Sequence, residues 1–425
     1  MKNYDVGSLP YELQNIALGA CFLGSGGGGK LKTSFDFIDD YFSNNKKFQD
    51  FRITDLITGL EEAKPNGSGI VVAYMGAPQK MGGVKCPDAV CEGIEKFKEA
   101  KENNYIEYII PVEIGPVSMI TACLTALEKS MRVLNVDGAG RAVPTLDLIT
   151  YATKASVNPT ILCSENLNPD KSKDPIYHQI KLEILGDKDK LDAASKMESL
   201  ARPVLNLAEF DQKAGLVMWY FKDVTELLTD NACVPRTLTF CQTLGGAIRS
   251  MQGKNWNFPE IEELFKSQLI YPAINENYPA IKEMCRGKLH SATISTAGGF
   301  DVGVITIEDE NDSERHYTII FQNESLILWD SSYATPLITA PDLISYMIED
   351  PKGQHVFTNG DIMEGGALKK DLRDKEIVVY GIAAPNALRD PESNTIKPEM
   401  LKPYMSVLNS LDYYGTYEPL VKEKG

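Results

Sequence analysis

The chain has 425 residues, of which 43% are apolar, and this length predicts two or three domains of ordinary globular composition. Its 59 acidic and 43 basic side chains give a formal net charge of −16, which argues against a nucleic-acid or membrane partner because no lysine and arginine cluster is present. With only four histidines, a multi-histidine metal site is not expected, and no metal or cofactor is predicted.

The first 170 residues alternate helical and extended patterns and predict an α/β domain with a mainly parallel sheet. Apolar residues recur at helical spacing over 13–21 and 35–42, on either side of a run of glycines. Four short apolar runs are typical of buried strands, at 70–74, 108–112, 132–136 and 160–163. Residues 118–129 between two of them predict a crossover helix.

Residues 171–390 predict a helical segment followed by a β-rich C-terminal domain. Helical spacing is found at 191–201, 215–228 and 235–251. Strands are predicted at 290–295, 302–307, 316–321, 325–329 and 376–380, with a short helix over 341–348. Residues 391–425 form a predicted tail with one helical patch over 400–411.

No run reaches the ~18 apolar residues of a membrane-spanning helix, and the first residues do not have the pattern of a signal peptide. The eight cysteines lie in apolar contexts, which is typical of reduced, buried thiols. These features predict a cytoplasmic protein.

The glycine run is the strongest local motif. Gly24 to Lys30 match the first seven positions of a phosphate-binding P-loop, but Leu31 stands where Ser or Thr is needed, and both this motif and the dinucleotide fingerprint require a preceding strand. A helix is predicted there instead, so nucleotide binding is the less favoured reading. Glycines that admit positive φ can expose backbone N–H groups to a ligand. A flexible linker is the alternative to a substrate-binding loop, whose predicted residues are Ser25, Gly26, Gly27, Gly28 and Gly29.

Loops that follow the predicted strands carry further candidates. In an open parallel sheet, ligands bind at the carboxyl ends of the strands. Gly76 follows the first strand, Glu113 the second, and Asp137 and Arg141 the third. We predict Glu113 and Asp137 as catalytic carboxylates and Gly76 and Arg141 as substrate-binding residues, with Arg141 holding an acidic substrate tail. The alternative is that Asp137 and Arg141 form a pair that ties their own loop together.

Several blocks together resemble the DUF917 family of S-methyl-thiohydantoin desulfurase-like (S-Me-THD) proteins. They are found, in family order, at 17–29, 75–78, 113–115, 136–144, 234–238, 245–249, 321–324 and 340–344. The chain departs from the family pattern at Lys30-Leu31, where an acid–proline pair is usual. It departs again at Pro116-Val-Ser118, where Gly-x-Asn is usual.

The resemblance implies an N-terminal α/β domain, a β-rich C-terminal domain and a link to hydantoin metabolism. The expected function is a hydrolase that acts on a small cyclic amide of the hydantoin or S-methyl-thiohydantoin type. The alternative is a non-catalytic ligand-binding subunit of a hydantoinase-like complex. The expected partners are therefore a small-molecule substrate and a hydantoinase-like protein, with a homo-oligomer as a further option.

Overall fold

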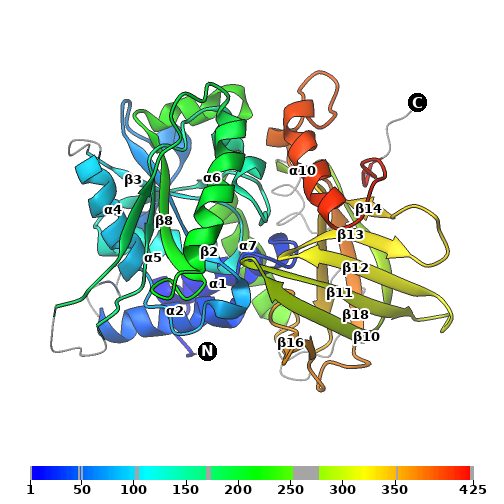
Figure 1. Ribbon diagram of the computed structural model, residues 1–425. Helices are drawn as coiled ribbons and strands as arrows, with labels where there is room; N and C mark the ends of the chain where they lie inside the picture. Colours follow the sequence, from blue (N-terminus) through cyan, green and yellow to red (C-terminus); the bar gives the residue numbers. More distant parts are fainter. Residues whose placement is uncertain are drawn as a thin grey trace.

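The computed structural model describes residues 2–45, 48, 51–100, 105–168, 174–251, 277–350 and 353–421. Its described residues divide into two parts that lie side by side in Figure 1. The described residues up to 251 form the α/β half, and those from 277 onward form the β half. This arrangement confirms the predicted α/β domain followed by a β-rich C-terminal domain.

The α/β half alternates helices and strands over most of its length. The helices are α1 (Leu9–Leu23), α2 (Leu31–Asn44), α3 (Ile53–Leu56), α4 (Asp88–Ala100), α5 (Pro116–Glu128), α6 (Lys190–Leu205) and α7 (Thr237–Met251). The strands are β1 (Ile57–Thr58), β2 (Gly69–Gly76), β3 (Tyr108–Pro111), β4 (Arg132–Leu134), β5 (Val136–Asp137), β6 (Thr160–Cys163), β7 (Gln179–Leu182), β8 (Lys213–Phe221) and β9 (Val234–Pro235). Short 3₁₀ turns include η3 (Pro78–Lys80), η4 (Leu146–Leu148), η5 (Thr150–Thr153) and η6 (Val224–Asn231).

Within the described residues, the sheet of this half has the order β1-β4-β3-β2-β8-β6-β7. The pairs from β1 to β2 are parallel, and the pairs from β2 to β7 are antiparallel. The sheet is therefore mixed. The expectation that 160–163 lies parallel to its neighbours is wrong, because its neighbour β8 runs in the opposite direction.

Helices and turns cover both faces of this sheet, as the alternation along β2 shows. Ile70 and Val72 pack into the core beneath α1, α2, α5 and α7. Val71, Ala73 and Met75 pack into a second core beneath α6, η4 and η5. Burial on both faces explains why these strands are continuous apolar runs in the sequence.

The β half is one bent antiparallel sheet, in which β10 pairs with β11, β17 and β18. Its strands are β10 (Ile281–Ala297), β11 (Phe300–Asp309), β12 (His316–Gln322), β13 (Glu324–Asp330), β14 (Ile338–Thr339), β15 (Leu343–Ile348), β16 (Met363–Glu364), β17 (Ala367–Leu368) and β18 (Glu376–Ile382). One path runs β10-β11-β12-β13-β14, and β18 pairs with both β10 and β15. Helix α10 (Pro398–Ser410), after the turn η7 (Asn386–Leu388), packs on Leu326 and Leu388.

Two predicted helices are strands, and both errors have the same cause. Residues 215–228 contain β8 and then η6, and residues 341–348 contain β15. Six of the nine residues of β8 and all six of β15 are buried in a continuous run. A strand buried on both faces has no alternation that would distinguish it from a buried helix.

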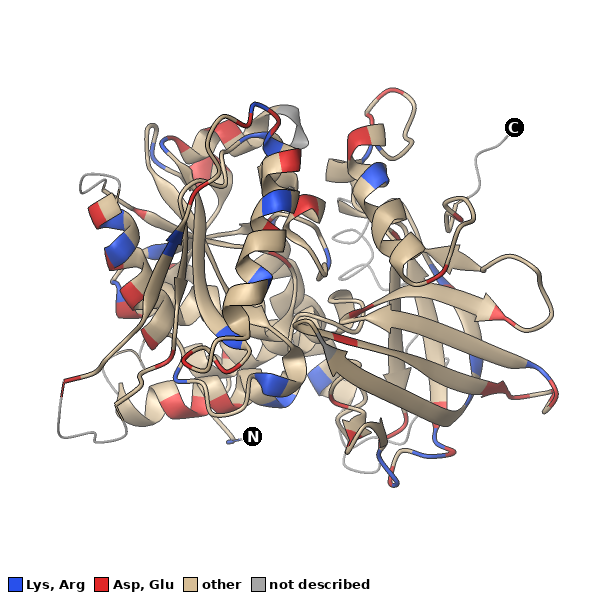
Figure 2. Ribbon diagram, in the orientation of Figure 1, with Lys and Arg blue, Asp and Glu red and all other residues tan. Residues whose placement is uncertain are grey.

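The eight cysteines are buried free thiols, as predicted. Figure 2 shows that the charged residues gather on the outer helices and on the loops of the β half, while the strands are largely uncharged. Among the residues that the structure describes, no helix is long and apolar enough to cross a membrane.

Candidate functional site

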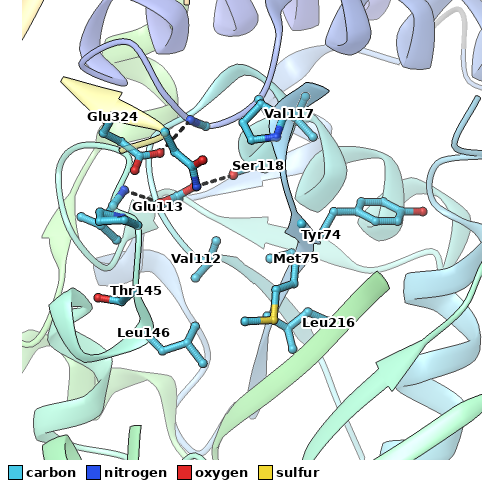
Figure 3. Close-up of a pocket in the computed structure, with 18 of the residues that line it drawn as sticks. Tyr74, Met75, Val112, Glu113, Val117, Ser118, Thr145, Leu146, Leu216 and Glu324 are labelled. Carbon is cyan, nitrogen blue, oxygen red and sulfur yellow. Dashed lines mark hydrogen bonds between the residues drawn. The ribbon is translucent and has the colours of Figure 1, made fainter. Parts of the chain in front are cut away.

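A cavity of about 90 Å³ lies at the carboxyl ends of β2 and β3, where the two halves of the molecule meet. Its walls come from the glycine loop, from these strand ends, from β8, from the segment after β5, from α6 and from the start of β13. Figure 3 shows Glu113, Ser118 and Glu324 at one end, and Met75, Val112, Leu146 and Leu216 toward the other. A volume of this size holds several water molecules or one small ring.

The glycine loop connects α1 to α2 and turns sharply, because Ser25, Gly26, Gly28 and Gly29 all have positive φ. It also packs too closely for side chains. A Cβ on Gly27 would lie 2.1 Å from Glu324 Oε1, and one on Gly28 would lie 2.3 Å from the Cα of Gly115. The four glycines are therefore explained by a close approach of backbone to both halves of the molecule.

The loop divides into two parts, one that lines the cavity and one that contacts the β half. Gly28 and Gly29 line the cavity. Ser25 faces the β half instead, where its Oγ donates to the carbonyl of Ser325 or Ile344, both at 3.2 Å, and accepts from the N–H of Ile344 at 2.9 Å. Gly26 and Gly27 pack beside Asn359 and Glu324 of the β half. The three residues Ser25 to Gly27 are thus a contact between the halves and are outside the cavity lining.

Glu113 follows β3 and lines the cavity, as the strand-end argument predicts. Its carboxylate accepts hydrogen bonds from Ser118 Oγ at 3.0 Å and from the N–H of Val143 at 2.7 Å. Ser118 stands at the position of the Asn in the family pattern described above. Burial raises the pKa of Glu113 to about 7, against the opposing effect of these two donors. Glu113 is therefore poised to exchange a proton near neutral pH.

Glu324 is the carboxyl group that the β half contributes. It is the first residue of β13 and follows Asn323, whose φ of 57° makes the tight turn from β12. The N–H of Gly28 donates to its Oε1 at a long 3.4 Å, and no described residue hydrogen-bonds its Oε2. Burial raises the pKa of Glu324 well above its ordinary value, and the nearby charge of Glu113 raises it further. Glu324 is thus favoured in its protonated form when Glu113 is ionised.

Asp137 and Arg141 lie behind the cavity wall and are not part of its lining. Asp137 Oδ2 accepts from the N–H groups of Ala139 and Gly140, both at 2.8 Å, and burial raises its pKa to about 7. The guanidinium of Arg141 is fully buried and donates to the main-chain carbonyls of Ala142, Pro341, Asp342 and Ser325 at 2.8–3.0 Å. Arg141 therefore ties its loop to the β half through main-chain oxygens, and it does not pair with Asp137.

The arginine that does line the cavity is Arg202 of α6. It pairs with Glu198, one turn earlier, and donates to the carbonyls of Gly299 at 2.8 Å and Pro144 at 3.0 Å. Its guanidinium also lies 4.0 Å from the centre of the Phe300 ring. Arg202 joins α6 to the β half and closes one side of the cavity.

The residues around the cavity offer few features for a metal or a nucleotide. Across the described residues, no group of three or more His, Cys, Asp and Glu side chains could hold a metal ion. Helix α1 precedes the glycine loop, so the strand that a P-loop or a dinucleotide fingerprint needs is replaced by a helix.

The structure thus brings together Glu113, Gly28, Gly29 and Gly76 from the predicted set. Three other residues of the lining, Glu324, Arg202 and Glu198, were not predicted from the sequence. Glu324 had one signal, its place in the family-like block at 321–324, immediately before a predicted strand. For Glu198 and Arg202 the only signal was their four-residue spacing on a predicted helix, which is common on exposed helix faces.

The fold and the cavity define a protein of two halves, α/β and β-rich, with a small site between them that contains a carboxyl pair. The sequence comparisons agree with this class. Residues 11–170 match the S-Me-THD-like N-terminal domain and residues 192–398 match the S-Me-THD-like C-terminal domain, so the chain belongs to the S-Me-THD-like family.

A solved structure gives a likeness over the whole chain. The chain is similar to the crystal structure of a protein from Chromobacterium violaceum, with 28% identity, coverage of 97% of this chain and 99% of that chain, and a TM-score of 0.75. No curated protein matches the chain.

Proposed function

We propose that this protein is a hydrolase that acts on a small cyclic amide of the hydantoin or S-methyl-thiohydantoin type. One observation carries the proposal: two buried carboxyl groups, Glu113 and Glu324, one from each half, line a single small cavity and both have raised pKa values. Such groups serve as general base and general acid near neutral pH. Membership of the S-Me-THD-like family supports a hydantoin-related ring as substrate.

The environments of the two carboxyl groups indicate which is the general base and which is the general acid. Glu113 accepts from two donors that stabilise its ionised form, so we assign it the role of base that takes a proton from water. Glu324 has one long donor and no described partner on Oε2, so its protonated form is favoured and it is assigned the role of acid. The N–H of Gly28 donates to Glu324, and Gly29 lines the same cavity, where its N–H would stabilise the carbonyl oxygen of a hydantoin as charge develops on it.

For an S-methyl-thiohydantoin the reaction balances with water alone. Water attacks the ring carbon that carries sulfur, the carbon–sulfur bond breaks, and methanethiol leaves. The carbon becomes a carbonyl carbon, and the two protons of water end on the ring nitrogen and on the thiol. For a hydantoin, the same attack on a ring carbonyl breaks the carbon–nitrogen bond. The carbon becomes a carboxyl carbon that keeps the oxygen of water, one proton goes to the nitrogen, and the other stays on the carboxyl group or is released to solvent.

The test is turnover of hydantoin and S-methyl-thiohydantoin by wild type and by Glu113→Gln. We expect product release by wild type and a loss of ~10²–10⁴-fold in kcat/KM for the variant, which is the range for removal of a general base. Glu226→Gln, an exposed carboxylate on η6, is the matched control and should retain full activity. Equal rates for wild type and Glu113→Gln would contradict the assigned base. Turnover that required an added hydantoinase-like protein would instead support a partner subunit.

A further inference from the structure

We propose that the ring of the substrate carries a compact apolar substituent, and that Met75, Val112, Leu146 and Leu216 select for it. This inference rests on the proposed function and adds the class of side chain on the ring. It replaces the acidic substrate tail that the sequence argument assigned to Arg141, because every hydrogen bond that we describe for that guanidinium goes to a main-chain carbonyl.

The first observation is the division of the cavity into a polar and an apolar end. Glu113, Glu324 and Ser118 lie together at one end, where the ring would have to react. The other end is lined mainly by Met75 of β2, Val112 after β3, Leu146 of η4 and Leu216 of β8, and Thr145 and the Arg202–Glu198 pair lie beside Leu146. The four apolar side chains remain 2–7% exposed. A ring held at the carboxyl pair would therefore direct its substituent against aliphatic carbon.

The second observation concerns the arginine of the cavity. Arg202 is the side chain that could hold a substrate carboxylate, but its Nε donates to Glu198 and its two terminal nitrogens donate to Gly299 and Pro144. Its charge is matched by Glu198, and its flat face lies on the ring of Phe300. A carboxylate tail would have to compete with Glu198 for the charge of Arg202, whereas an apolar group leaves the pair undisturbed.

The third observation is electrostatic. When Glu113 is ionised, the polar end carries a negative charge, with a second carboxyl group beside it. An anionic tail in a cavity of about 90 Å³ would lie close to that charge in a poorly solvated space. Like charges held this way repel strongly, so the site disfavours an acidic substituent.

The test is binding of a series of hydantoins substituted at ring carbon 5 with hydrogen, methyl, isopropyl, isobutyl or carboxymethyl, measured by calorimetric titration. We expect affinity to increase by about fourfold for each buried methylene. The carboxymethyl compound should bind at least ~10-fold more weakly than the isopropyl compound of similar size. Leu146→Ala or, if that variant does not fold, Leu216→Ala should lose the preference for isopropyl and gain affinity for isobutyl.

Leu228→Ala, at a leucine 56% exposed on η6, is the control and should keep the wild-type ranking. Affinity that is flat across the series, or highest for carboxymethyl, would overturn this inference and leave the proposed ring chemistry standing. A complete absence of binding across the series would overturn the proposed function and this inference together.

Discussion

At the scale of single residues, the cavity is organised by carboxyl groups whose environments differ. Glu113 and Glu324 face one another across the junction of the halves, and only Glu113 has short hydrogen bonds to its carboxylate. Asp137 has a similarly raised pKa but lies outside the cavity lining, where its carboxylate holds the loop from Ala139 to Gly140. We therefore treat Asp137 as a positioning residue: its loop continues to Val143, which donates to Glu113.

Asp137→Asn tests the burial of this carboxyl group through stability. The folded-state pKa of Asp137 is about 7, above its unfolded value of ~3.9, so the stability linked to its protonation is present below pH ~4 and lost as pH rises through 7. The amide has no such loss. The free energy of unfolding of the variant, measured by urea titration, should improve relative to wild type by up to roughly 4 kcal/mol between pH 4 and pH 8. A difference that did not change with pH would contradict the burial of an ionisable Asp137.

At the scale of elements, the glycine loop is constrained by residues that are far away in the sequence. Gly27 has no room for a side chain because Glu324 of the β half lies against it. The contact comes from a strand of the other half, and so the need for glycine could not be derived from the motif itself.

Gly27→Ala should therefore displace Glu324. The added Cβ would lie 2.1 Å from its Oε1, and overpacking of this kind costs about 1–3 kcal/mol. We expect a lower unfolding temperature together with reduced turnover. Gly82→Ala is the matched control, since a Cβ there meets no atom within 4 Å. Equal effects of the two substitutions on stability and turnover would show that the close packing at Gly27 is unimportant.

The elements also show which parts of the fold could be predicted from the sequence and which could not. Strands β2 and β3 were predictable from short apolar runs, and the helices on either side of the glycines from periodicity. The glycine motif then located Gly28 and Gly29, and the carboxyl-end rule located Glu113 and Gly76. Strand β8 was not predicted as a strand, because its apolar run continues into η6 and the two together make a stretch of helical length. Its direction, which makes the sheet mixed, depends on tertiary pairing alone.

At the scale of the whole molecule, buried hydrogen bonds join the halves, and two groups of them are centred on Arg141 and Ser25. Arg141 donates to carbonyls of Ser325, Pro341 and Asp342, and Ser25 exchanges hydrogen bonds with Ile344 and Ser325. The site lies between the same halves, and Glu324 could be assigned to it only once their arrangement was known. The cavity therefore depends on the two halves remaining docked.

Arg141→Ala should weaken this docking. It removes the donor of several buried carbonyls and leaves a cavity, which costs on the order of 3 kcal/mol or more. We expect a single thermal transition for wild type and, for the variant, a lower transition temperature or two separate transitions. Arg286→Ala, which removes a partly exposed pair with Glu283, should cost at most about 1 kcal/mol. Comparable effects of the two substitutions in a calorimetric scan would contradict the role of Arg141 in holding the two halves together.

The central claim is that Glu113 and Glu324 act as base and acid, and the pH profile of kcat/KM tests it most directly. With S-methyl-thiohydantoin as substrate, wild type should show an acidic limb near pH 7, where Glu113 loses its proton, and an alkaline limb where Glu324 loses its own. Glu324→Gln should have a lower maximum rate and no alkaline limb. A rate that is constant from pH 5 to pH 9 in wild type, or an alkaline limb that persists in Glu324→Gln, would contradict the assignment.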